Sequence, residues 1–253
     1  MSEIRLTIDG RESTAVAGDT VLDAALSAGV SIPHLCHHER LSPTGGCRLC
    51  LVKIDGVPGP VTSCTTPARD GMAVTAFDDE LESMRRLLID LLLAEHSCDC
   101  LVCESAGSCE LQDLAYRYGL DRRSRRFALP ERELPEPDAS SPVLVHDPSK
   151  CVLCERCIKA CDEIEGKAIL NFAHRGLSTV VTASPSGWGV SKCDGCGECI
   201  ELCPTGAIRE KMPDRPPRRW EMDRVQTTCS YCGVGCQLDL WTVSYTHLRA
   251  HET

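Results

Sequence analysis

Cysteine spacing is the feature that most restricts what this chain can fold into. The chain has 19 cysteines in 253 residues, and 18 of them fall into short, regular intervals. Such intervals bring several thiolates within reach of one metal centre. The alternative is a disulfide scaffold, but these scaffolds are short and secreted, and the repeated two-residue gaps here are too tight for most bridges. We therefore expect metal binding rather than crosslinking.

Composition and charge narrow the choice further. Hydrophobic residues make up 42% of the chain but aromatic residues only 4%. Several small modules stabilised by bound clusters therefore fit better than one large core. The formal charge of −10 disfavours nucleic acid and anionic membranes as partners. No stretch approaches the ~18 to 20 apolar residues of a membrane span, and the N-terminus has no secretory signal, so we expect a cytoplasmic protein.

The first module is expected over residues 1–77. Alternating polar and apolar residues predict the first strand, and Asp9-Gly10 predicts a hairpin turn. Asp19 or Thr20 is expected to cap a short helix that ends at Gly29. The expected strands are Glu3–Ile8, Ser13–Val16, Leu51–Ile54 and Met72–Thr75, with the helix at Thr20–Ala28.

This module contains four cysteines that could hold one 2Fe–2S cluster: Cys36, Cys47, Cys50 and Cys64. The two glycines before Cys47 would let backbone amides approach the sulfurs. A mixed site with histidine ligands is the alternative, because His34, His37 and His38 flank Cys36. Since four cysteines are already present, we expect these histidines to be solvated loop residues.

The second module is expected over residues 78–119. Asp78–Ala94 has the pattern of an amphipathic helix with acidic residues in its first turn. The helix leads to one histidine and three cysteines that lack a fourth cysteine partner. These residues are His96, Cys100, Cys103 and Cys109. Cys98 has no place in the pattern and is expected to be a free thiol, although it could compete with Cys100.

Residues 142–211 contain an internal repeat. Lys150–Cys161 and Lys192–Cys203 each carry the Cys-x2-Cys-x2-Cys-x3-Cys run of bacterial two-cluster ferredoxins. In such runs the fourth cysteine binds the other cluster. One 4Fe–4S cluster is therefore expected on Cys151, Cys154, Cys157 and Cys203, and a second on Cys193, Cys196, Cys199 and Cys161. Zinc is the alternative for any Cys-x2-Cys pair, but zinc sites use two separated pairs.

Two linkers and a last module complete the chain. Residues 120–141 and 212–223 are rich in proline and charge, which predicts solvated connectors. Residues 224–243 hold three thiolates, Cys229, Cys232 and Cys236, with no cysteine after them. A 4Fe–4S cluster there would lack its fourth ligand, and a three-cysteine zinc or 3Fe–4S site is the alternative. We interpret residues 244–253 as a sequencing-adapter artefact joined to a truncated reading frame.

These motifs resemble known families. The first module resembles a β-grasp 2Fe–2S ferredoxin, and its cysteine spacing resembles the G subunit of NADH:quinone oxidoreductase. Residues 96–119 (HSCDCLVCESAGSCELQDLAYRYG) resemble the one-histidine, three-cysteine 4Fe–4S motif of that family, which implies that His96 is a ligand. The stretch TTCSYCGVGCQLDLW resembles the start of molybdenum or tungsten bis-pterin oxidoreductases. The resulting expectation is an α+β, multi-domain iron–sulfur protein.

The order of the motifs resembles the α subunit of cytosolic NAD-dependent formate dehydrogenases. That resemblance implies one 2Fe–2S cluster, three complete 4Fe–4S clusters and an incomplete fourth. It also implies a Mo or W bis-pterin outside this chain, no catalytic residue within it, and electron transfer as its only activity. The implied partners are a flavoprotein subunit with FMN and NAD sites and its small 2Fe–2S subunit. Three alternatives remain: the G subunit of NADH:quinone oxidoreductase, a hydrogenase-associated electron-transfer subunit, and a stand-alone electron carrier.

Overall fold

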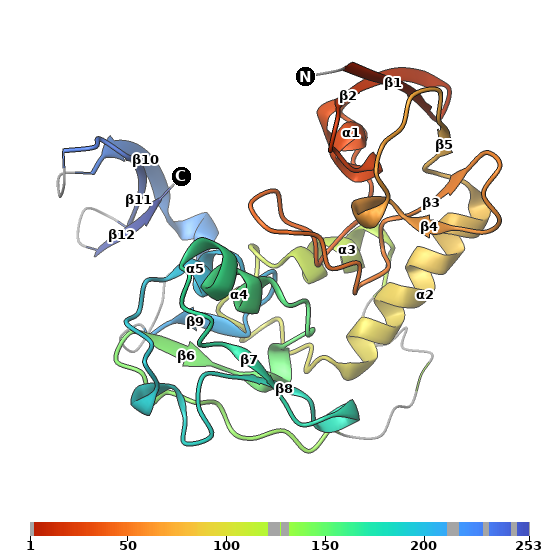
Figure 1. Ribbon diagram of the computed structural model, residues 1–253. Helices are drawn as coiled ribbons and strands as arrows, with labels where there is room; N and C mark the ends of the chain where they lie inside the picture. Colours follow the sequence, from red (N-terminus) through yellow and green to blue (C-terminus); the bar gives the residue numbers. More distant parts are fainter. Residues whose placement is uncertain are drawn as a thin grey trace.

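The computed structural model describes residues 3–120, 127, 132–211, 218–229, 233–243 and 247–252. Figure 1 shows a small N-terminal sheet followed by the long helix α2, and short helices and strands that form the second half of the chain. Within the described residues, no helix combines the length and the apolar character needed to cross a bilayer.

The N-terminal module is a five-stranded sheet with one helix packed on it (Figure 1). The strand order is β2-β1-β5-β3-β4; β1 pairs antiparallel with β2 and parallel with β5. Buried side chains of the helix join strand residues such as Ile8 and Val52 in one apolar core. The elements are β1 (Glu3–Ile8), β2 (Arg11–Val16), α1 (Val21–Ser27), β3 (Leu51–Ile54), β4 (Val61–Thr62) and β5 (Ala73–Thr75).

The expected secondary structure of this module is confirmed apart from small shifts in its ends. Asp9 and Gly10 turn the hairpin with φ of 48° and 76°, as a two-residue turn requires. Thr20 caps α1 in a capping box, in which its Oγ1 accepts from the Asp23 amide at 3.2 Å. Of the strands, β4 alone was not predicted, because two residues carry no periodic signal.

Helix α2 (Asp79–Glu95) begins one residue later than expected, because Asp78 is its N-cap and accepts from the Leu81 amide at 2.8 Å. The buried face of α2 packs on α3 (Glu110–Arg117) through a cluster that includes Ile89, Leu93, Leu111 and Leu114. This second helix was not predicted. Together the two helices hold the intervening loop of histidine and cysteines between them.

The repeated segment folds as two similar halves. Leu153 and Glu155 in the first half have positive φ, and so do Gly195 and Gly197 at the matching positions of the second. Each pair precedes a short helix that carries the third cysteine of its run. The elements are β6 (Leu144–His146), α4 (Arg156–Lys159), a π-helix (Ala160–Ile164), β7 (Asn171–Ala173), β8 (Val180–Thr182), α5 (Glu198–Glu201) and β9 (Ile208–Glu210). Strands β6 and β9 pair antiparallel, as do β7 and β8.

The expectation that residues 120–141 form a solvated connector is wrong for two of the described residues. The Arg132 guanidinium donates to the Leu177 and Thr179 carbonyls at 2.9 and 2.8 Å, and its side chain is only 5% exposed. Asp138 pairs with His146 through backbone hydrogen bonds. Backbone carbonyls and a free strand edge on the repeat therefore fix this part of the connector; residues 121–126 and 128–131 lie outside the described residues.

The C-terminal part is a three-stranded antiparallel sheet of β10 (Asp223–Thr228), β11 (Gln237–Val243) and β12 (His247–Glu252). Strand β12 lies within the residues that we interpret as an artefact, and that interpretation stays a prediction. The second connector is described from residue 218 and residues 212–217 lie outside. Isolated 3₁₀ turns occur at Ser63–Thr65, Pro148–Lys150, Gly176–Ser178, Trp188–Val190 and Arg219–Glu221.

Candidate iron–sulfur sites

The four cysteines of the first module come together. The thiols of Cys47 and Cys64 donate to the Cys36 sulfur, which lowers the pKa of Cys36. The Cys64 thiol is also hydrogen-bonded to Cys50, and this contact lowers the pKa of Cys50 to about 6. All four sulfurs are thus linked in one chain of contacts, and three of the residues are buried. This is the arrangement of donors that a 2Fe–2S cluster requires.

Backbone amides support the same site. The Cys47 amide donates to the Cys36 sulfur at 3.4 Å, and the Gly46 amide also lowers the pKa of Cys36. Gly45 has a φ of 68°, and a Cβ there would lie 3.0 Å from Thr65 Cγ2. Glycine therefore allows the close approach of the loop that the sequence predicted, and amides aimed at sulfur stabilise the charge of a cluster.

The expectation of solvated histidines beside Cys36 is wrong for His37, which is 6% exposed. Its ring packs edge-on against His34 at 5.5 Å, and its Nε2 lies 3.5 Å from Asp23 Oδ1. Burial is the main reason that the pKa of His37 is lowered. The loop folds back onto α1 instead of projecting into water, which places this ring in the interior.

His96, Cys100, Cys103 and Cys109 line one small cavity. His96 is the C-cap of α2 and Cys109 is the N-cap of α3, so the end of one helix and the start of the other position two of the four side chains. Burial raises the pKa of Cys109 to about 12. The structure therefore brings together the four residues that the family resemblance implied as ligands.

Two neighbours explain the shape of this cavity. A Cβ on Gly206 would lie 3.2 Å from Cys103 Sγ and 2.8 Å from Ser105 Oγ, so only glycine fits there. Cys98 turns away from the cavity lining: its thiol donates to the Leu93 carbonyl at 3.5 Å, while its amide donates to His96 Nδ1 at 3.0 Å. Cys98 thus orients the histidine through its backbone, and the prediction of a free thiol is compatible with this position.

Replacing His96 with cysteine should lower the midpoint potential of the 4Fe–4S cluster at this site. A thiolate adds a negative charge that the neutral imidazole does not, and this disfavours reduction. We expect a decrease on the order of 100 mV, judged from the effect of histidine ligands on iron–sulfur potentials. Redox titration followed by EPR measures the change, and the other clusters of the same molecule serve as the internal control. An unchanged or higher midpoint would show that His96 is not a ligand.

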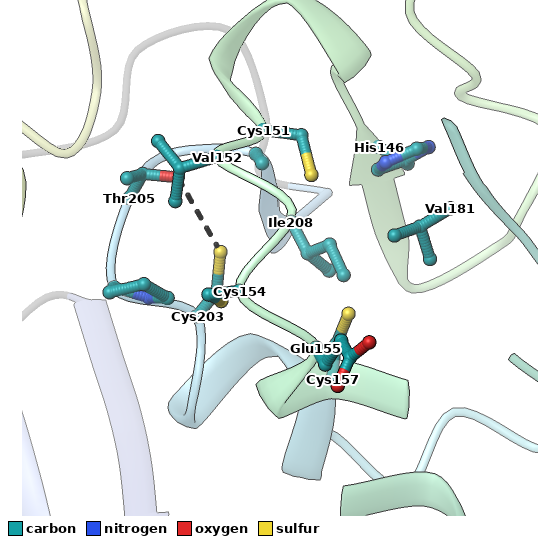
Figure 2. Close-up of a pocket in the computed structure, with 12 residues that line it drawn as sticks. His146, Cys151, Val152, Cys154, Glu155, Cys157, Val181, Cys203, Thr205 and Ile208 are labelled. Atoms are coloured by element: carbon teal, nitrogen blue, oxygen red, sulfur yellow. Dashed lines mark hydrogen bonds between the residues drawn. The ribbon is translucent and has the colours of Figure 1, made fainter. Parts of the chain in front are cut away.

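Cys151, Cys154, Cys157 and Cys203 line a second cavity. Figure 2 shows these side chains around one space, with Cys203 reaching it from the second half of the repeat. We call these four residues the first repeat site. Burial raises the pKa of Cys151 to about 11, and it raises the pKa of Cys154 and Cys157 further.

The other four cysteines of the repeat form the second repeat site: Cys161, Cys193, Cys196 and Cys199. Burial raises the pKa of Cys199 to about 12, and the charges of Cys196, Cys193, Cys203 and Cys161 add to this effect. The Ile169 amide donates to Cys161 Sγ at 3.4 Å, and the Leu153 amide donates to Cys151 Sγ at the same distance. Amide donors to sulfur are therefore present at both repeat sites.

The residues present fit iron–sulfur clusters in their chemistry. The sites are rich in sulfur and largely apolar, and burial opposes the charged thiolate unless a metal compensates it. A bound cluster would supply one-electron redox chemistry, and the protein would supply thiolates, amide dipoles and exclusion of water. Within the described part of the chain, no three or more His, Cys, Asp or Glu side chains surround a position for a metal ion; the predicted ligand sets of the His96 site and the first repeat site line cavities instead.

The last predicted site is described only in part. The Cys229 amide donates to the Cys236 carbonyl at 2.8 Å, which places the two residues side by side where β10 ends and β11 begins. Gly233 and Gly235 both have positive φ in the connecting turn. Cys232 lies outside the described residues, so its place in the predicted set stays a prediction.

Contacts join the 2Fe–2S loop, residues 36–50, to the repeat. Leu41 is buried against Ala160 and Leu202. Arg40 forms an ion pair with Glu198 at 3.1 Å, and the Ser42 carbonyl accepts from Lys159 Nζ at 2.7 Å. The loop that carries Cys36 and Cys47 thus rests on the two short helices that carry cluster cysteines of the repeat.

Sequence reasoning missed an ion pair between two of the sites, in which the arginine is buried and the glutamate side chain is partly exposed. The Arg156 guanidinium donates to both carboxylate oxygens of Glu110 at 2.5 and 2.8 Å, and Arg156 is 3% exposed. It joins α4 of the first repeat site to α3, which follows Cys109. Nothing in the cysteine spacing distinguishes this arginine from the other residues between ligands.

Four family models match successive parts of the chain. Residues 1–78 match a 2Fe-2S iron-sulfur cluster binding domain, and residues 85–124 match the NADH-ubiquinone oxidoreductase-G iron-sulfur binding region. Residues 141–209 match the ferredoxin-like domain of NADH-quinone oxidoreductase subunit 3. Residues 222–252 match the molybdopterin oxidoreductase Fe4S4 domain.

Curated relatives are longer than this chain. It is 38% identical over 236 residues to the NADH-quinone oxidoreductase G 2 subunit of Rhizobium meliloti, and 36% identical over 236 residues to NADPH-Fe(3+) oxidoreductase subunit alpha of Geobacter sulfurreducens. Each match covers 93% of this chain and 27% of the relative. The chain therefore spans about a quarter of their length.

A solved structure matches this chain over most of the length of both chains. A chain in the crystal structure of NAD+-reducing [NiFe]-hydrogenase in the H2-reduced state superimposes with a TM-score of 0.78 and 35% identity. The match covers 86% of this chain and 92% of that one. Together with the family models, this identifies a multi-domain protein with 2Fe–2S and 4Fe–4S domains.

Proposed function

The chain belongs to the family of iron–sulfur electron-transfer subunits of NADH-dehydrogenase-like complexes, and from this premise we propose that it is the electron-transfer part of a cytoplasmic formate dehydrogenase. The observation that most strongly supports this proposal is the order of the sites along the chain. A match to the molybdopterin oxidoreductase Fe4S4 domain follows directly after the two-cluster segment. That order supports a Mo or W bis-pterin as electron donor, bound outside these 253 residues.

In this proposal the chain passes electrons and performs no bond chemistry. Cys229, Cys232 and Cys236 provide part of the site nearest the donor, and the two repeat sites come next. The contacts of Leu41 with Ala160 and Leu202, which directly follow α4 and α5, support transfer onward to the 2Fe–2S loop. The acceptor is a flavoprotein subunit with FMN and NAD sites, together with its small 2Fe–2S subunit. Each step depends on how thiolates, amides and burial set the potential of a cluster.

A second candidate is the electron-transfer subunit of a hydrogenase. This candidate is favoured by the match to the chain of NAD+-reducing [NiFe]-hydrogenase. The match covers most of both chains, including 92% of the hydrogenase chain. The two proposals share the clusters and the flavoprotein acceptor but differ in the donor. The match of residues 222–252 to a molybdopterin-enzyme domain favours the first.

Iron analysis of the anaerobically reconstituted chain tests the cluster content that both proposals share. We expect about 14 iron atoms per chain, from one 2Fe–2S and three 4Fe–4S clusters, and about 18 if the three-cysteine site also fills. Acid-labile sulfide should match the iron. A colourless protein, or one that binds zinc instead, would contradict the assignment of all the sites.

Enzyme assays distinguish the two donors. The complex that holds this chain, the proposed pterin site and the flavoprotein partner should reduce NAD+ with formate and not with hydrogen. The present chain, without the pterin site, should show no formate-dependent dye reduction. Hydrogen-dependent reduction of NAD+ by the complex would favour the second candidate. Formate oxidation by this chain alone would contradict the proposal that the chain only transfers electrons.

A further inference from the structure

His146 is a buried histidine that the cluster assignment leaves unused. It is the last residue of β6, 3% exposed, and its Nε2 has no hydrogen-bond partner among the described residues. The residue lines the same cavity as Cys151, Cys154, Cys157 and Cys203. Figure 2 shows the imidazole beside Cys151 and Val181 at the edge of that cavity.

The surroundings hold the ring in place without satisfying this nitrogen. Trp188 packs against the imidazole with a centroid distance of 5.4 Å, and the backbone of His146 is paired with Asp138. Elsewhere the cavity is lined largely by apolar groups such as Val181, Ala207 and Ile208. The Thr205 hydroxyl, which also lines it, donates to the Lys150 carbonyl at 2.7 Å.

An unpaired polar atom at this depth is costly, and native proteins rarely tolerate one. Glu155 also lines the cavity, but its carboxylate is not bonded to the ring in any contact of the described residues. The remaining candidates for a partner are sulfurs. Sulfur accepts weak hydrogen bonds as a thiol and stronger ones as a thiolate or cluster sulfide, because these carry negative charge.

We propose that His146 donates a hydrogen bond from Nε2 to a sulfur of the 4Fe–4S cluster at the first repeat site and so raises its reduction potential. His146 is then a positioning and tuning residue, not a ligand, since four cysteines already complete the set. The inference rests on the proposed function, because it requires that this site holds a cluster.

The direction of the effect follows from charge. Reduction adds an electron to the cluster, and a hydrogen bond to sulfur stabilises the more negative state more than the oxidised one. Without the donor, we expect the ratio of reduced to oxidised cluster at a fixed potential to fall about tenfold, which corresponds to about 59 mV for a one-electron couple.

Three variants of the reconstituted chain test this by redox titration with EPR detection. His146→Leu removes the donor and should lower the midpoint of one 4Fe–4S cluster by the amount given above. His146→Gln keeps an N–H donor and should restore most of the shift. His174→Leu, at an exposed histidine in the same segment, should change no midpoint. Equal midpoints in wild type and His146→Leu, or equal shifts in the Leu and Gln variants, would overturn the proposal.

A measurement on the wild type keeps the test decisive if a variant does not fold. Pulsed EPR of protein with ¹⁵N-labelled histidine should show the strong coupling of the bound nitrogen and the weak coupling of the remote nitrogen of a ligand histidine. It should also show a further weak coupling, to the cluster of the first repeat site, and this coupling should disappear in His146→Gln. A wild-type spectrum without this further coupling would overturn the proposal. Iron content distinguishes a failure of this proposal from a failure of the cluster assignment. A protein with full iron and no further coupling refutes the role of His146, whereas missing iron refutes the cluster assignment itself.

Discussion

Replacing Cys203 with serine should remove about four iron atoms per chain, and they should come from the cluster whose other ligands lie in the first half of the repeat. The reason is that Cys203 lines one cavity together with Cys151, Cys154 and Cys157. A cluster with one weak alcohol ligand is expected to be lost on reconstitution, since cluster affinity depends on thiolate donors. Iron and sulfide analysis, with EPR of the reduced protein, measures the loss.

Double variants identify which cluster is lost. If Cys157 and Cys203 bind the same cluster, the double variant Cys157→Ser/Cys203→Ser should lose no more iron than either single variant. The pair Cys199→Ser/Cys203→Ser should lose about eight iron atoms, because it damages both clusters. Cys98→Ser is the matched control and should lose none. If the Cys199/Cys203 double variant lost only four, each half of the repeat would hold its own cluster and the crossed ligation would be wrong.

The spacing of ligands was the most predictable part of this molecule. Runs such as Cys151 to Cys161 are local in sequence, so counting gaps was enough to predict which side chains line one cavity together. The first strand pair and helix α1 were predictable for a similar reason, because the hairpin turn at Asp9-Gly10 and the cap at Thr20 are local signals. Helix α3 was missed because it is only eight residues long and its N-cap, Cys109, makes no side-chain capping bond that would mark its start.

Long-range contacts were not predictable from one sequence. His37 is buried because the loop folds back onto α1, and Arg156 is buried because α3 brings Glu110 to it. Neither contact leaves a periodic pattern, and each joins residues that lie far apart along the chain. His146 ends a three-residue strand, and its role depends on which residues face it from the second half of the repeat.

Arg85 is the clearest case of such a contact, and it bears on the stability of the 2Fe–2S site. The side chain is fully buried under the N-terminal sheet. Its Nε donates to the Leu49 carbonyl at 3.1 Å, and its Nη2 donates to the carbonyls of Leu51 and Ala76 at 2.6 and 2.7 Å. Leu49 and Leu51 flank Cys50, so one guanidinium from α2 fixes the backbone on both sides of a predicted ligand. Glu82 pairs with the same guanidinium.

Replacing Arg85 with methionine should therefore lower the free energy of unfolding of the N-terminal module by about 3 to 5 kcal/mol. Three buried carbonyls would lose their donor, at about 1 to 3 kcal/mol each, and apolar packing by methionine would offset part of the loss. The measurement is urea unfolding of the reconstituted protein, followed through the visible circular dichroism of the 2Fe–2S cluster. Arg86→Met is the matched control: it makes the same change on the same helix but, among the described residues, removes one hydrogen bond, to the Tyr118 carbonyl, and should cost about 1 kcal/mol. Equal losses in the two variants would mean that Arg85 contributes only helix charge and packing, and that the backbone around Cys50 is held by the cluster itself.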